Sequence, residues 1–166
     1  MQLSPAALHA LAERDLVAAT AETGLPLTPW LVGDETVGTW RRRDAQVAEH
    51  PEDLAWVTGV VCDDATGVVV GRAGFHAAPD ERGMVEAGYA VDPRHRRQGR
   101  AHAILEHLHA RALAEPAVRV LRLSISPDNT ASLAVAARLP FTVVGEQWDD
   151  EDGLETILEL DVSAAR

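Results

Sequence analysis

Three short strand-like segments, joined by turns of only a few residues, constrain the fold of this chain most. Residues 56–62, 68–75 and 84–91 are rich in valine, aromatic and small apolar side chains. The stretches between them, 63–67 and 79–83, contain the Asp, Gly and Pro residues that are typical of turns. Such connections are too short for a crossover helix, so the three strands are expected to form an antiparallel meander.

Helical and extended segments flank this meander. Ser4-Pro5 predicts the start of a first helix, and Asp34 predicts the cap of a second. Apolar residues at helical spacing predict a long helix from Ala101 that stops at Pro116. The first of these helices extends to about 17–23, and the second covers 36–49. The other segments are an extended or irregular stretch at 25–32, a strand at 120–125, a helix at 129–139, strands at 141–148 and 154–160, and an acidic turn at 149–153. This order indicates an α/β fold around one mixed sheet.

Composition narrows the function. The 166 residues suit one domain, with a helical region at 1–53 and a core at 54–161. The net charge of −11 argues against a general nucleic-acid binder, which needs a broad basic face. Lysine is absent, so Schiff-base and phosphate-loop chemistry are excluded. Cys62 is the only cysteine, and neither a targeting segment nor a membrane-length apolar run is recognisable. We therefore expect a cytoplasmic protein with no membrane partner.

The junction at residues 91–101 carries the strongest chemical signal. Four of the fifteen arginines lie within seven residues there, and Gly99 stands where the long helix begins. The first N–H groups of a helix have no partner inside it and attract anions. Glycine lets a phosphate approach the backbone closely. The junction therefore suits a pyrophosphate, and the alternative is a solvated basic turn with glycine at a tight corner.

The pattern Pro93-x-x-Arg96-x-x-Gly99-x-Ala101 resembles the acyl-CoA pyrophosphate motif of the GNAT N-acetyltransferase superfamily, commonly written R/Q-x-x-G-x-G/A. Three more segments resemble this family, and the resemblance extends over about residues 55–160. They are Glu-Ala-Gly-Tyr-Ala-Val at 86–91, similar to the family's fourth strand; Asn-Thr-Ala-Ser at 129–132, similar to the branch that acetylates ribosomal-protein N-termini; and Arg-Leu-Pro-Phe at 138–141, similar to the leucine-glycine-phenylalanine block.

The resemblance implies a mixed, mostly antiparallel sheet flanked by helices, which splays between the family's fourth and fifth strands. Acetyl-CoA would bind in this gap as co-substrate. Its pantetheine arm would bond to the backbone of Ala90 and Val91, and the Asn129 side chain would hold its thioester end. Its pyrophosphate would meet the motif, which supplies Arg96 and the main-chain N–H groups of Arg97, Gln98, Gly99, Arg100 and Ala101.

The implied reaction is direct acetyl transfer to a primary amine. Glu86 is an acidic residue inside an apolar strand, and alternation places it on one face with Gly88 and Ala90. It is our candidate base, directly or through water; the alternative is a solvated or arginine-paired carboxylate. Ser132 is the candidate donor to the leaving thiolate, since Ala136 stands where many family members carry a tyrosine. Alternatively, Ser132 packs in the first turn of a helix capped by Asn129.

The acceptor is less well defined by the sequence. By analogy, it binds among the N-terminal helices, the ends of the meander and the last hairpin, where Trp30, Trp40 and His76 are candidate wall residues. The two tryptophans fit a core equally well. An acidic surface attracts a cationic acceptor, such as a polyamine, an aminoglycoside or a basic peptide; the alternative is that it only keeps the protein soluble. The acceptor that we expect is a protein N-terminus or a small amine. No metal site and no nucleic acid are expected, and a homodimer is compatible with the sequence.

A non-catalytic acyl-CoA-binding or regulatory module of the same fold is the alternative function. Ala136, in place of the tyrosine, and Pro140, in place of the glycine of the last motif, fit this interpretation. Glu86 and Ser132 favour an enzyme. The sequence does not distinguish further between the two.

Overall fold

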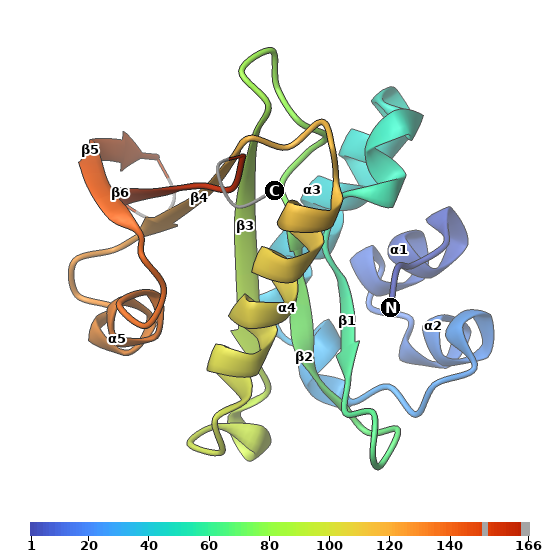
Figure 1. Cartoon of the computed structure of the whole chain (residues 1–166). Coiled ribbons are helices and arrows are strands. Elements are labelled where there is room, and N and C mark those ends of the chain that lie inside the picture. The colour runs from blue at the N-terminus through green and yellow to red at the C-terminus, as the bar shows by residue number, and fades with distance from the viewer. Residues whose placement is uncertain (151–152, 164–166) are drawn as a thin grey trace.

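The computed structural model describes residues 1–150 and 153–163. Its centre is a six-stranded sheet with the strand order β1-β2-β3-β4-β6-β5 (Figure 1). Neighbouring strands are antiparallel except β3 and β4, which are parallel. The strands are β1 (Gly59–Cys62), β2 (Val69–Phe75), β3 (Met84–Val91), β4 (Val120–Ile125), β5 (Thr142–Asp149) and β6 (Gly153–Asp161). The meander predicted from the short turns is confirmed.

Helices cover both faces of this sheet. The α-helices are α1 (Pro5–Ala12), α2 (Leu16–Thr23), α3 (Asp34–Glu49), α4 (Arg100–Ala114) and α5 (Thr130–Ala136), and short 3-10 turns lie at Pro29–Val32, Pro51–Ala55 and Pro93–His95. In Figure 1, α4 crosses in front of β2 and β3, whereas α3 passes behind them. None of the helices in the described part of the chain has the length and apolar character needed to cross a bilayer.

Two hydrophobic clusters correspond to the two faces. The larger one lies under α4, where Leu105 and Leu108 pack on Phe75, Val85 and other strand residues. The second lies between the N-terminal helices and the first two strands, and Trp40 is buried in it. The Trp40 indole N–H donates to the carbonyl of Leu31, so its one polar atom is satisfied. In the larger cluster, the apolar stripe predicted for the long helix faces the sheet, as expected.

Several element boundaries differ from those that the sequence predicted. The first helix is broken at Arg14, which has a positive φ of 62°, and Asp15 caps α2 by accepting from the Ala18 N–H. Asp34 is the first residue of α3 rather than its cap, because Gly33 holds the cap position. Residues 56–58 precede the first strand, and α5 ends at Ala136, three residues early. The tip of the acidic turn, at 151–152, lies outside the described residues.

The sheet divides into two halves at β3 and β4. These strands pair over only three positions, Met84↔Val120, Val85↔Leu121 and Glu86↔Arg122. Beyond Glu86, β3 continues along β2, while β4 continues along β6. The expected splay is therefore present, and in the numbering of this chain it falls between the third and fourth strands. Figure 1 shows β4, β5 and β6 turned away from β3.

Candidate active site

The free edge of β3 faces the gap, and strand alternation determines which backbone groups reach it. The His76 N–H donates to the Glu86 carbonyl at 2.8 Å, and the Asp92 N–H donates to the Val70 carbonyl at 3.0 Å. In an antiparallel ladder each residue directs its N–H and C=O to the same side. Even-numbered residues of β3 therefore bond to β2. Ala87, Tyr89 and Val91 direct their backbone groups into the gap.

This alternation corrects one predicted cofactor contact. Ala90 is paired with Arg72 of β2, so its N–H and C=O are directed away from the gap. Val91 does face the gap, and its carbonyl accepts from Nε of Arg96 at 3.1 Å. Adjacent residues of a strand direct their backbone groups to opposite sides, so Ala90 and Val91 cannot both bond to a ligand in the gap. Tyr89 and Val91 are the two that suit an extended ligand.

The turn after β3 contains the residues that the sequence predicted to bind a pyrophosphate. Asp92 caps the 3-10 turn at Pro93–His95, and the chain then passes through left-handed conformations at Arg97 (φ 58°) and Gly99 (φ 76°). Within the described residues, the N–H groups of residues 97–101 donate to no other group. A Cβ built on Gly99 would meet no heavy atom within 4 Å, so its surface is open. These features suit a pyrophosphate.

Side chains brace this turn from two directions. Arg100 forms a close ion pair with Asp63, which lies in the turn between β1 and β2. The hydrogen bond from Arg100 lowers the pKa of Asp63 to about 2. Asp92 accepts from the Arg94 guanidinium at 2.8 Å and from the Thr28 hydroxyl at 3.1 Å. The side chain of Arg100 is therefore engaged in fixing the turn, while its N–H remains available.

The far end of the gap is formed by α5 and Tyr89. Asn129 caps α5, and its Oδ1 accepts from the Ser132 N–H at 3.1 Å. The Tyr89 hydroxyl is buried and makes no hydrogen bond within the described residues; burial raises its pKa, and the nearby Ser132 opposes that increase. Ala136 is fully buried. A cavity of about 350 Å³ separates these groups from β4, and Tyr89, Asn129 and Ser132 line it. Two hydroxyl groups, those of Tyr89 and Ser132, therefore line this cavity, whereas the sequence predicted only that of Ser132.

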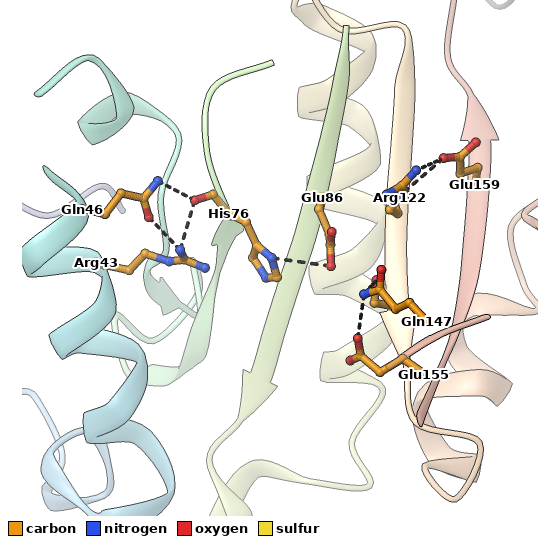
Figure 2. Close-up of polar contacts among 9 residues, drawn as sticks. Arg43, Gln46, His76, Glu86, Arg122, Gln147, Glu155 and Glu159 are labelled. Atoms are coloured by element: carbon orange, nitrogen blue, oxygen red, sulfur yellow. Dashed lines mark hydrogen bonds and ion pairs between the residues drawn. The ribbon is translucent and has the colours of Figure 1, made fainter. Parts of the chain in front are cut away.

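A larger cavity of about 710 Å³ adjoins the smaller one and shares Arg72, Tyr89 and Glu155 with it. Glu86 projects into the larger cavity, with a side chain that is 21% exposed, and its Oε1 lies 3.5 Å from Nδ1 of His76. Figure 2 shows the two side chains pointing toward each other across β2 and β3. Burial lowers the pKa of His76 to about 4, and the nearby guanidinium groups add to this effect. The imidazole is therefore neutral at pH 7, and with its proton on Nδ1 it can donate toward the Glu86 carboxylate.

A polar network holds His76 in place. Its carbonyl accepts from Arg43 at 3.0 Å and from the Gln46 amide at 2.8 Å (Figure 2). The same Gln46 amide donates to the buried Asp53, which in turn accepts from the Ala78 N–H. A Cβ on Gly88 would lie 2.8 Å from Nε2 of His76, so glycine is needed for the ring to lie there.

The structure assigns the remaining predicted residues differently. Trp30 and Trp40 do not line the larger cavity; Trp40 of α3 is buried in the N-terminal cluster, and Trp30 of the 3-10 turn at Pro29–Val32 packs against it. Sequence reasoning missed the three arginines that do line the cavity, Arg42 and Arg43 from α3 and Arg72 from β2. The pairing of Arg72 with Ala90 was the available signal, since it follows from extending the meander register.

No group of three potential metal ligands is present in the described ranges 1–150 and 153–163. His102 and Glu106 lie 3.4 Å apart on α4 and form an (i, i+4) pair. Such a pair fits a helix surface without a metal ion.

Comparison with known proteins agrees with this geometry. Residues 4–142 match the family described as Acetyltransferase (GNAT) domain, so the chain belongs to the GNAT family. A Bacillus subtilis (strain 168) protein, "Uncharacterized N-acetyltransferase YjdG", is 34% identical over 73 residues, and this match spans 44% of each chain. The match thus covers less than half the length of that relative.

Solved structures share the fold at low sequence identity. A spermidine N-acetyltransferase SpeG chimera from Vibrio cholerae and hSSAT has a TM-score of 0.68 at 13% identity, over 99% of this chain and 95% of that one. RimL, a ribosomal L7/L12 α-N-protein acetyltransferase in complex with coenzyme A, has a TM-score of 0.64 at 21% identity, over 96% and 89%. A phosphinothricin acetyltransferase from Sinorhizobium meliloti with acetyl-CoA has a TM-score of 0.61 at 18% identity, over 97% and 86%.

Proposed function

We propose that this protein transfers the acetyl group of acetyl-CoA directly to a primary amine. The observation that carries the proposal is the row of free N–H groups at residues 97–101, placed at the mouth of a gap that leads along β3 to Glu86. The donors suit the pyrophosphate, and the exposed edge of β3 suits an extended pantetheine arm. Two of the structural neighbours, RimL and the phosphinothricin acetyltransferase, contain coenzyme A or acetyl-CoA.

Different residues around the gap perform the separate parts of the reaction. An amine is protonated at pH 7 and must lose a proton before it attacks. Glu86 accepts that proton, directly or through water, and neutral His76 at 3.5 Å orients the carboxylate. Bound acetyl-CoA supplies an activated thioester whose C–S bond breaks as the C–N bond forms. The hydroxyl of Ser132, backed by that of Tyr89, hydrogen-bonds the departing thiolate.

The side chains of Asn129 and Arg96 have positioning roles in this proposal. Asn129 fixes the first turn of α5 and so sets the position of Ser132. Arg96 orders the carbonyl of Val91 at the entrance of the gap. Neither contact requires that the side chain touch the reacting atoms. The acceptors in the names of the neighbours, spermidine and a ribosomal protein, are those of the neighbours alone.

Thiol release from acetyl-CoA across a panel of primary amines tests this function. The expected result is amine-dependent release, together with acetylated product in the mass spectrum. Binding of coenzyme A in calorimetry without release for any amine would favour the non-catalytic module, with which Ala136 and Pro140 agree. Loss of coenzyme A binding altogether would overturn both.

A homodimer is the assembly that we propose. β5 is the last strand of the sheet, and Val143, Val144 and Trp148 on it are strongly exposed. Exposed apolar side chains on an edge strand favour association. Sedimentation equilibrium at micromolar concentration tests the assembly, and a monomer mass would contradict it.

A further inference from the structure

The larger cavity is lined by three arginines and by four carboxylates, those of Glu86, Asp149, Asp150 and Glu155. Arg72 projects from β2, and Arg42 and Arg43 project from α3 toward the same space. Arg72 shares a face of the meander with Gly74 and His76, because alternate side chains of a strand lie on the same side. The opposite wall carries Glu155 of β6, whose carboxylate accepts from Gln147 at 2.9 Å (Figure 2). The cavity is therefore bipolar.

Arg72 has no carboxylate partner among the residues that the structure describes. Its guanidinium makes no hydrogen bond or ion pair with them, and its Nε is buried without a partner. The Nε of Arg43 is also buried without one. Burial and the charges of Arg42 and Arg43 lower the pKa of Arg72 to about 10, so the group still carries its charge at pH 7. A half-buried guanidinium that lines a cavity and has an unpartnered Nε suits a ligand that supplies an anion.

We infer that the acceptor is a zwitterion, a primary amine that also carries a carboxylate, with the carboxylate bound to Arg72. Arg43 lies beside the same space and adds to its positive charge. The ammonium group then lies toward Glu86, on the same face of the neighbouring strand, where its proton is removed. Arg72 also lines the smaller cavity with Ser132, so the site lies where acceptor and thioester meet.

This inference rests on the proposed function and deepens it. It narrows the cationic acceptor that the acidic composition suggested, because the cavity offers guanidinium groups as well as carboxylates. Two sources share the required chemistry: a free amino acid, and a peptide N-terminus with an acidic side chain nearby. A polyamine offers no anion for Arg72.

The test compares matched acceptors and matched variants. Initial rates of thiol release are measured with linear ω-amino acids of two to six carbons, their amides, tripeptides with an acidic or a neutral second residue, and spermidine. We expect an amino acid or an acidic peptide to exceed its neutral counterpart in kcat/KM by at least about 10-fold. Arg72→Gln should reduce that preference by about 10- to 100-fold, the contribution of a charge-assisted hydrogen bond.

The control variant is Arg138→Gln, which removes an exposed guanidinium outside both cavities. It should leave the preference unchanged, and coenzyme A affinity should stay within about twofold in both variants. Equal rates with amides or spermidine, or an equal loss in Arg72→Gln for neutral and anionic acceptors, would overturn the inference while leaving the acetyltransferase function intact.

A binding readout separates the two proposals. Calorimetry of the preferred carboxylate-bearing amine, titrated into the protein with coenzyme A bound, should show binding that Arg72→Gln weakens by about 10-fold or more. Such binding without turnover of any amine would contradict the proposed function but support the anion site. Binding that is unaffected by Arg72→Gln would overturn the inference even if turnover is found.

Discussion

Glu86 is an acidic side chain in the middle of a largely apolar strand, and the architecture of the meander explains what it does there. Its neighbours on the same face, Gly88 and Ala90, are small, so no bulky side chain of β3 fills the space next to Glu86. The His76 ring fits over Gly88 only because glycine lacks a Cβ. A carboxylate, an imidazole and open space for an amine thus result from the residue sizes on one strand face.

Glu86→Gln tests the role of the carboxylate as base. The amide keeps the size of the side chain but cannot accept the proton, so kcat should fall by about 10²- to 10⁴-fold. Coenzyme A affinity should be retained, because the pyrophosphate site lies at the other end of β3. The decisive measurement is the pH–rate profile, whose shape should change in the variant.

Glu81→Gln is the matched control, since Glu81 is exposed in the turn before β3. It should leave both kcat and the profile unchanged. A pH–rate profile in Glu86→Gln identical to that of the native protein would remove Glu86 from the mechanism.

Asp92 links the end of β3 to the anion site and to the N-terminal region. Hydrogen bonding to Arg94 lowers the pKa of Asp92 from 3.8 to about 2, against the opposing effect of burial, and Thr28 contributes. Because the folded-state pKa is the lower one, the stabilisation is present above about pH 4 and is lost as the pH falls toward 2. Its size is roughly 2 kcal/mol, from about 1.4 kcal/mol per pKa unit.

Asp92→Asn should therefore reduce the free energy of unfolding by roughly 2 kcal/mol at pH 7, and by progressively less below pH 4. Urea unfolding at a series of pH values measures both effects. Asp64→Asn, at an exposed turn position, should change little. A loss that is the same at pH 7 and pH 2.5 would show that packing, and not charge, is responsible.

At the scale of elements, the turn between β3 and α4 depends on a left-handed residue at Gly99. Gly24 at the end of α2 is a matched case, because its φ is 65° and that of Gly99 is 76°. A Cβ built on either glycine would meet no heavy atom within 4 Å. Alanine at either position should cost about 1 kcal/mol of unfolding free energy from backbone strain. Only Gly99→Ala should also weaken coenzyme A binding, because its Cβ enters the space for the pyrophosphate.

Thermal unfolding of both variants, with and without coenzyme A, measures the two effects together. The prediction for Gly99→Ala is a smaller upward shift of Tm on adding the ligand than in Gly24→Ala. Equal shifts in the two variants would mean that the pyrophosphate does not approach Gly99.

The sequence predicted the central elements well because their signals are local. Alternation and turn residues delimit β2 and β3, and the apolar stripe delimits α4. The break at Arg14 was missed, since a left-handed arginine is stabilised by its context and not by its own preference. The early end of α5 follows from Pro140: the last turns close through short-range bonds, such as Leu139 N–H to Ala136 O at 3.0 Å, in place of a left-handed glycine.

The candidate site was predictable only in part for a related reason. The anion-binding turn is contiguous in sequence, so its motif is visible. Arg72 reaches the cavity through strand pairing with Ala90, and Arg43 reaches it from a helix almost thirty residues earlier. The contact between Tyr89 and Ser132 likewise joins a strand to a helix across the gap. Such long-range juxtapositions leave no periodic signal in a single sequence.

At the scale of the whole molecule, two half-sheets meet along a short line. β1, β2 and β3 pack under α4, whereas β4, β6 and β5 extend away with α5, and three residue pairs join β3 to β4. A ligand that lies in the gap contacts both halves: the edge of β3 on one side, and Asn129 and Ser132 on the other. Binding should therefore stabilise the halves together, by about 2.7 kcal/mol at a hundredfold excess of ligand over Kd.

The alternation along β3 gives this picture a residue-resolved test by amide hydrogen exchange. The amides of Gly88 and Ala90 face β2 and are bonded there, whereas those of Tyr89 and Val91 face the gap. In the free protein the Tyr89 and Val91 amides should exchange faster than their two neighbours. Coenzyme A should slow Tyr89 and Val91 by a larger factor than Gly88 and Ala90, because only the former gain new hydrogen bonds. Equal slowing of all four amides would indicate general stabilisation without strand-like pairing, and would contradict a pantetheine arm lying along this edge.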